Sequence, residues 1–295
     1  MRKKNRFAAH DYQYSSLPNT RKDAFKDVYR HNFLNILKSG IMLLVFAVPL
    51  MLFMLIMDIG KLGMVPANYS EEDLKVVLLI WDVIVNVGFL ILFILILVAL
   101  SGILRVLKLT IYQEGVDFFY DFKLGIKENF AHILVFFAFY SLIYLVTYFL
   151  QLFFLGYQLI GLAILLFFFI IFTPIFLWCI MTISVYQTKV VDYLKNGAFF
   201  FFKNIGFSML FLLLTIWPII ICILFSENIF SAGVNIFYII IKNVVLIVMF
   251  LLYYPCLTII YLLFASSKFD LFINKDNYPE IYRKGLYDIA KNNKQ

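Results

Sequence analysis

The side chains best placed for chemistry are four polar residues inside long apolar runs. Asp82 and Asn86 lie about one to two helical turns inside one run, and Lys242 and Asn243 lie at similar depth in another. A charge at membrane depth costs about 2.5 kcal/mol or more, so it indicates a functional site or a partner of opposite charge. A structural Asp82–Lys242 pair near interfacial water is the preferred interpretation. A solute path lined by all four residues is the alternative.

Metal and catalytic chemistry find little support in the sequence. The histidines are His10, His31 and His132, too few and too scattered for a metal cluster, and the three cysteines lie in apolar runs without CxxC spacing. The HExxH, GxSxG and phosphate-loop signatures are absent. We therefore predict no catalytic, metal or cofactor site and no enzymatic activity. An enzyme acting on a lipid-soluble substrate ranks third among the functions considered.

The composition indicates an integral membrane protein. Hydrophobic residues make up 63% of the chain and charged residues 15%, whereas soluble domains have roughly 45–50% and about 25%. The net charge is +7, but the basic residues flank the apolar runs, where they would meet anionic lipid headgroups. We therefore expect the lipid bilayer as a partner, with other membrane subunits as further partners, and no nucleic acid.

The apolar runs predict an all-α bundle of six transmembrane helices. Each run reaches roughly the 20 residues that a helix needs to cross a bilayer. The third and fourth are separated by only three residues, 156–158, as in a tight helical hairpin. The predicted spans are Phe33–Met57, Val76–Leu104, Ala131–Leu155, Leu159–Tyr186, Ile205–Phe225 and Ile236–Phe264.

Basic residues predict the orientation in a cell membrane. Of the 25 lysines and arginines, 22 lie in the two terminal segments and the two loops that a cytoplasmic N-terminus would place inside. Both termini are therefore predicted to be cytoplasmic. This divides the chain into a basic tail (1–22), a six-span domain (23–265) and a C-terminal tail (266–295) with a short helix opened by Pro279.

Prolines occur in four of the six runs and predict kinks. Each removes a backbone donor, which a helix bundle tolerates when neighbouring groups satisfy the freed carbonyl. A static packing role is the commoner outcome, and a hinge is the alternative. The four residues are Pro49, Pro174, Pro218 and Pro255.

A charged, amphipathic phrase recurs before the first, third and fifth spans. DAFKDVYRHNFLNIL (23–37) and DFFYDFKLGIKENF (117–130) share an apolar stripe and an Asn-Phe pair, and 189–207 is a weaker copy. This pattern is typical of a helix in the headgroup plane. We predict a hairpin-type unit, an interfacial cytoplasmic helix followed by two spans, used three times. A chance amphipathic lead-in to each span is the alternative.

One segment resembles the YesL-like family of bacterial membrane proteins. In SGILRVLKLTIYQEGVDFFYDFKLGIKENF (101–130), a span ends in an Arg-containing exit, which is followed by Asp-Phe and then by Lys-x-Asn-Phe. Just before this segment, the chain has Val98-Ala99 where that family has Pro-Ala. The resemblance covers part of the chain and implies an uncharacterised inner-membrane protein linked to sugar uptake, with no catalytic residues. The matching positions are Arg105, Asp121, Phe122, Lys127, Asn129 and Phe130.

The functional prediction is a non-enzymatic accessory or scaffold component of a membrane complex, with solute or sugar uptake as the context. It fits the sparse charge inside the spans, the amphipathic cytoplasmic segments and the resemblance. The alternative is a small-solute transporter or channel in its own right, which would need a water-accessible path and motion at the prolines.

Overall fold

All regular elements of the described residues are helical. The computed structural model describes residues 17–64, 71–153, 158–231 and 236–287. In chain order the elements are α1 (Arg21–His31), α2 (Phe33–Met64), α3 (Glu71–Ile111), α4 (Phe118–Phe153), α5 (Gln158–Val185), α6 (Val190–Lys203), α7 (Ile205–Ser231), α8 (Ile236–Val248), the π-helix η2 (Met249–Tyr253), α9 (Tyr254–Phe269), the π-helix η3 (Asp270–Asn274) and α10 (Lys275–Asn277).

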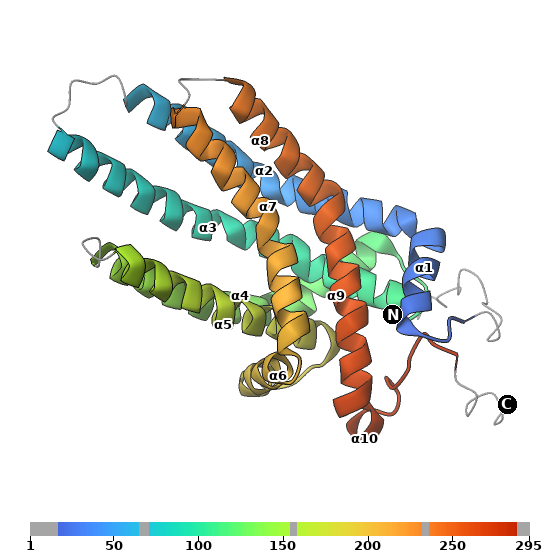
Figure 1. The fold of residues 1–295 in the computed structure, drawn as a ribbon. Coiled ribbons are helices and arrows are strands. Elements are labelled where there is room, and N and C mark those ends of the chain that lie inside the picture. The colour runs from blue at the N-terminus through green and yellow to red at the C-terminus, as the bar shows by residue number, and fades with distance from the viewer. Residues whose placement is uncertain (1–16, 65–70, 154–157, 232–235, 288–295) are drawn as a thin grey trace.

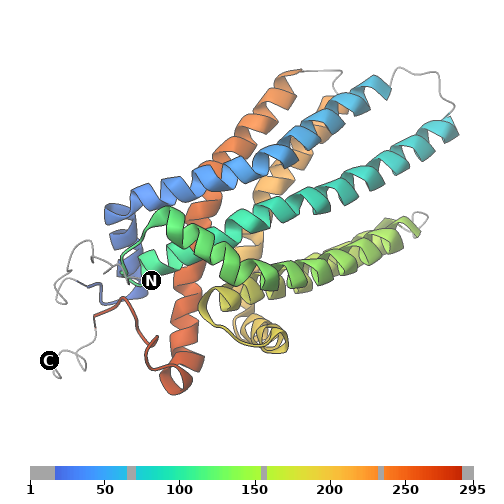
Figure 2. The same ribbon diagram turned by 180° about the vertical axis from the view of Figure 1, so that it is seen from behind.

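The long helices confirm a multi-pass, all-helical membrane protein. Within the described ranges, α2, α3, α4, α5 and the continuous path from α8 through α9 are long and apolar enough to cross a membrane. A sixth span results if α6 and α7, bent by 103° relative to each other, are counted together. The long helices run between two ends of the bundle, and α1, α6 and α10 lie at one of them (Figure 1). We call that end the basal end; Figure 2 shows it from behind.

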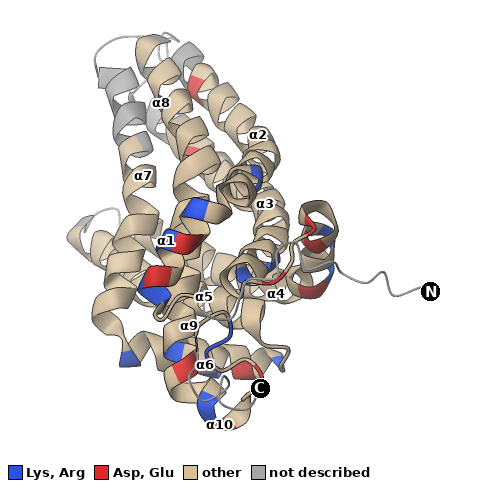
Figure 3. Cartoon of the chain, turned by 90° about the vertical axis from the view of Figure 1, so that its right-hand side faces the viewer, with Lys and Arg blue, Asp and Glu red and all other residues tan. Residues whose placement is uncertain are grey.

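Among the residues that the structure describes, charged side chains concentrate at the basal end (Figure 3). They lie on α1, on the start of α4, on α6 and around α10, while most of the length of the long helices carries other residue types. The flanks of the apolar runs, where the sequence places the lysines and arginines, thus come together in space at this end. Much of the apolar surface of the spans is exposed, as expected where a helix faces lipid.

The recurring amphipathic phrase forms separate helices at only two of its three positions. Asn32 interrupts the helix between α1 and α2, and Asn204 interrupts it between α6 and α7. The second copy forms the first turns of α4, which continues unbroken to Phe153. The prediction of a separate interfacial helix at 117–130 is therefore wrong. A buried face on these turns, including Phe122 and Asn129, packs along α3 and favours a helix that continues without a break.

The apolar stripe of α1 faces protein rather than lipid. Ala24 and Val28 are fully buried, and Phe25 and Tyr29 pack against the same core. Thr20 begins the helix by accepting a hydrogen bond from the Asp23 N–H (3.2 Å). α1 therefore covers the basal end of α9 and α3, which is not the lipid-facing placement that amphipathicity predicts.

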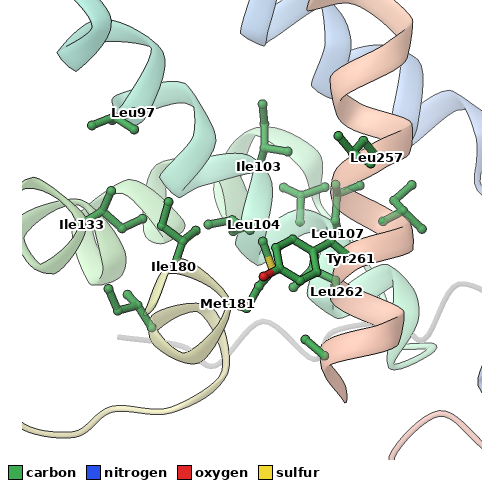
Figure 4. Close-up of a cluster of buried hydrophobic side chains, with 14 of the residues drawn as sticks. Leu97, Ile103, Leu104, Leu107, Ile133, Ile180, Met181, Leu257, Tyr261 and Leu262 are labelled. Carbon is green, nitrogen blue, oxygen red and sulfur yellow. The ribbon is translucent and has the colours of Figure 1, made fainter. Parts of the chain in front are cut away.

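A cluster of buried apolar side chains lies towards the basal end, where α3, α5 and α9 meet (Figure 4). Most of the buried residues of α3 belong to its second half, and α9 is buried along most of its length. Members of this cluster are Leu97, Ile103, Leu104 and Leu107 of α3, Ile133 of α4, Ile180 and Met181 of α5, and Leu257, Tyr261 and Leu262 of α9.

The prolines are accommodated in two ways. Pro49, Pro174 and Pro218 lie inside the continuous helices α2, α5 and α7. Pro255 instead follows the π-helix η2, where the Tyr254 N–H donates to the Met249 carbonyl, five residues earlier. A single turn of π-helix is a known way to insert an irregularity into a long helix, and it is often found at functional sites.

Candidate functional site

An ion pair inside the bundle joins α8 to α2. The Lys242 ammonium donates to the Asp58 carboxylate, and the Lys242 side chain is only 1% exposed. A charge in such surroundings is tolerated when an opposite charge and hydrogen bonds accompany it. From the sequence, Asp82 is the predicted partner of Lys242. In the structure the Lys242 ammonium contacts Asp58 instead. Asp58 was missed because the predicted span ended at Met57, and α2 continues past it to Met64.

The other predicted polar residues hold different helices. The Asn86 amide donates to the backbone carbonyl of Asp82 in its own helix (2.8 Å) and accepts from the Tyr144 hydroxyl of α4 (2.5 Å). The Asn243 amide donates to the Ile239 carbonyl within α8 (2.9 Å). Asn86 of α3 thus links its helix to α4, whereas the Asn243 bond stays within α8. The four predicted residues therefore do not share one set of contacts.

The residues that carry the YesL-like resemblance form a clamp between α3 and α4. The Arg105 guanidinium donates to the Glu128 carboxylate, and its Nε lies 3.6 Å from Asp121 Oδ1. Asp121 is almost fully buried and accepts from the Asp117 N–H (3.0 Å), which caps the start of α4. The Asn129 amide donates to the carbonyl oxygen of Ser101 across the same interface (3.2 Å).

The clamp depends on a close approach of the two helices. A Cβ added at Gly125 would lie 2.8 Å from the Arg105 Cβ and 2.9 Å from the Gly102 carbonyl oxygen. Phe122 packs over Gly102, where a Cβ would lie 2.6 Å from its ring. Lys127, by contrast, is exposed. The motif is thus largely explained by the packing of α3 against α4.

Replacing Arg105 with lysine is expected to lower the free energy of unfolding by about 1.5–3 kcal/mol. A lysine ammonium cannot reach both the buried Asp121 and the partly exposed Glu128 as a planar guanidinium does, so one of the two carboxylates loses its contact with a cation. Denaturation in detergent micelles measures the change. Lys127→Arg is the control, because this exposed motif residue should tolerate the exchange within about 0.5 kcal/mol. Equal stability of the two variants would show that the clamp contributes nothing.

A hydrogen-bond network at the basal end joins the two ends of the chain. Arg21 of α1 donates to the Asp270 carboxylate (2.8 Å) and to the Lys284 carbonyl (2.9 Å). The other Asp270 oxygen accepts from the Asn274 amide (2.8 Å) and from the Arg283 N–H (3.2 Å). Asp270 therefore fixes both α1 and the C-terminal segment to the end of α9.

The same network reaches α5 through Tyr186. Its hydroxyl donates to Asn274 Oδ1 (2.6 Å). Burial raises the pKa of Tyr186 above its ordinary value, and neighbouring Tyr112 and Asp270 raise it further. The phenol is therefore protonated at physiological pH and remains a hydrogen-bond donor.

The segment after α10 consists of turns, which corrects the predicted short helix opened by Pro279. Arg283 and Gly285 have positive φ angles (53° and 78°), which a right-handed helix does not accommodate. Leu286 is buried, and the Tyr287 N–H donates to the Pro18 carbonyl (3.0 Å). This segment covers the basal end of the bundle.

Comparisons of the chain with protein-family models, with curated proteins and with solved structures give no match. In the part of the chain that the structure describes, no three His, Cys, Asp or Glu residues gather as ligands for a metal ion. The functional argument therefore rests on the helices, on the polar contacts between them and on the space that they enclose.

Proposed function

We propose that this chain is a non-enzymatic accessory or scaffold component of a larger membrane complex. The observation that supports it best is how the chain uses its polar side chains. Lys242 binds Asp58 between α8 and α2, Asn86 binds Tyr144 between α3 and α4, and Arg105 joins α3 to α4. Each contact fastens one helix to another. The resemblance to YesL-like proteins adds solute or sugar uptake as the context of that complex.

The location proposed for the chain is a bacterial cell membrane, with the basal end and both termini in the cytoplasm. The concentration of charge at the basal end supports this orientation (Figure 3). In a background without native cysteines, a cysteine replacing exposed Asp276 should react with an impermeant maleimide only after permeabilisation. Reaction in intact cells would reverse the proposed orientation.

Helix α6 supports anionic lipid as a partner at that end. Tyr193 and Phe200 are buried against the bundle, while Val191, Leu194 and Phe202 on the same short helix are exposed. Lys195 and Lys203 on this helix are also exposed. Apolar side chains next to lysines suit a helix in the headgroup region. In this proposal α6 is the interfacial part of the hairpin that contains the fifth and sixth spans.

A second candidate function is a transporter for a small solute. It is favoured by the cavity described below, whose wall contains Pro218 and lies partly on the π-helix η2. Irregular helices that line a cavity are a recurring feature of transporters. This candidate requires the bundle to open, and motion at Pro218 or η2 would supply the opening.

Purification and flux measurements distinguish the two candidates. With a C-terminal affinity tag and mild detergent, an accessory protein should retain a membrane partner in stoichiometric amount. It should show no solute flux when reconstituted alone in liposomes. A transporter should instead purify alone, move solute in liposomes and lose this flux in the Thr215→Phe variant, which fills the cavity. A tagged membrane protein of similar size serves as the control for adventitious partners.

A further inference from the structure

An elongated cavity runs between the helices. It has a volume of about 270 Å³ and lies among α2, α3, α5, α7 and the path from α8 to α9. Lys242 on α8 and Tyr261 on α9 both line it. These residues are 19 positions apart along one helical path, which corresponds to roughly 28 Å at 1.5 Å per residue. The cavity is therefore long and narrow, and its length approaches the roughly 30 Å of a bilayer core.

The wall of the cavity is apolar over most of its length. Its lining includes leucine, isoleucine, methionine and phenylalanine side chains from five of the spans, among them Met54 of α2, Phe93 of α3 and Ile180 of α5. The hydroxyls of Thr215 and Thr258 in the lining donate to carbonyls of their own helices (2.7 and 2.8 Å). The wall thus offers few free polar groups.

Tyr261 is the exception. It is 4% exposed, and its buried hydroxyl has no hydrogen-bond partner among the described residues. In Figure 4 its ring points from α9 towards Met181 of α5. The ring is fixed by stacking on Phe211 (centroids 4.2 Å apart) and by the edge of Trp178 (5.5 Å). A buried hydroxyl without a partner costs about 1–3 kcal/mol, so it indicates an acceptor that occupies the cavity.

The character of the wall limits what this occupant can be. Water is unsuitable, because a buried water needs two to four polar partners and Tyr261 offers one. A peptide segment is also unsuitable, because each of its residues would bring unsatisfied backbone groups into an apolar space. A hydrocarbon chain with a single acceptor oxygen matches both the length of the cavity and its one unpartnered hydroxyl.

We propose that the cavity binds one fatty-acyl chain from the surrounding bilayer, with its uncharged carbonyl oxygen accepting a hydrogen bond from Tyr261. The chain extends from Tyr261 towards the Lys242 end, along Met54 and Phe93. The carbonyl belongs to an ester or to a protonated fatty acid, because an ionised carboxylate would be unfavourable in such an apolar wall. This site is independent of whether the protein acts as a scaffold or as a transporter.

Trp178 provides an internal reporter for the test. It is fully buried and lies against Tyr261. The chain has three tryptophans, so Trp81→Phe and Trp217→Phe together leave Trp178 as the only one. This background is placed in phosphatidylcholine nanodiscs and titrated with dibromostearic acid methyl ester, or with dibromostearic acid in a parallel arm. Bromine quenches tryptophan fluorescence at short range.

Saturable quenching of Trp178 by the methyl ester is the expected result. Tyr261→Phe keeps the ring and removes the hydroxyl, so the concentration for half-quenching should rise about fivefold, as for one lost hydrogen bond. Thr215→Phe, which fills the cavity, should abolish the saturable part. If that variant does not fold, Tyr261→Phe alone decides. Quenching by the free acid only when it is protonated at low pH would assign the site to fatty acids as well as to esters.

Leu213→Phe is the matched control. Leu213 lies two residues from Thr215 on α7, is 64% exposed and does not line the cavity. This variant should be quenched like the unchanged background. An unquenched Trp178, or quenching that is identical in the Thr215→Phe, Tyr261→Phe and Leu213→Phe variants, would overturn the proposal.

Discussion

Replacing Asp58 with asparagine is expected to lower the free energy of unfolding by about 3–5 kcal/mol, the range found when one partner of a buried ion pair is removed. The reason is the position of Lys242, whose side chain is 1% exposed and would lose the carboxylate that its ammonium contacts. Few positions in a helix bundle combine so complete a burial with a full charge. Denaturant titration in micelles, followed by circular dichroism, measures the loss.

Asp82→Asn is the control for this experiment. It makes the same chemical change in an aspartate of the neighbouring span, but at an exposed position. Its effect should stay within about 0.5 kcal/mol. Replacing both partners, Asp58→Leu with Lys242→Met, should restore most of the stability, because a buried ion pair can often be exchanged for apolar residues at little cost. A larger loss in Asp82→Asn than in Asp58→Asn would return Lys242 to the partner first predicted from the sequence.

The positions of the spans were predictable because they depend on length and apolarity alone. Five of the predicted runs match helices or helical paths long and apolar enough to cross a membrane, as Leu159–Tyr186 does with α5, while the fifth run counts as a span only when α6 and α7 are taken together. The ends of these helices were less predictable. The prediction ended at Met57 because a charged residue follows, yet Asp58 continues α2 as the partner of Lys242. A charged residue therefore marks the end of an apolar run in the sequence, but the helix itself can continue beyond it.

The pairing of polar residues was not predictable for a geometrical reason. A sequence indicates how deep a residue lies in the membrane, but not towards which neighbour its helix turns it. Asp58 lies near the C-terminal end of α2 and Asp82 near the N-terminal end of α3. Consecutive antiparallel spans bring these two ends to the same side of the membrane, so depth alone makes either residue a candidate partner for Lys242. The direction of each side chain depends on the packing of the whole bundle.

Tyr261 shows the same limit at the proposed lipid site. In the sequence it is one of 19 tyrosines, within a run of other apolar and aromatic residues. Its importance comes from a hydroxyl left without a partner after its ring is fixed between Phe211 and Trp178. No spacing rule signals this, because Phe211 and Trp178 belong to other helices.

A close approach of α2 to the π-helix η2 at Gly40 yields the second large effect. Gly40 is buried in α2, and a Cβ added there would lie 2.7 Å from the carbonyl carbon of Leu251 and 3.2 Å from its Cα. These are backbone atoms, so they cannot move aside as the end of a side chain can. Gly40→Ala is therefore expected to lower the free energy of unfolding by about 1–3 kcal/mol, and Gly40→Val by more. Denaturation in micelles measures both.

Gly206 gives the opposite expectation for the same substitution. It lies in the first turn of α7, and nothing lies within 4 Å of an added Cβ. Gly206→Ala should therefore raise stability by about 0.5–1 kcal/mol, since alanine loses less conformational freedom than glycine when a helix forms. The sign of the stability change on replacing glycine with alanine thus distinguishes Gly40, where close packing requires a glycine, from Gly206, where it does not. If Gly40→Ala also raised stability, α2 and η2 could not lie as close together as the structure places them, and the cavity wall that both help to form would have a different shape.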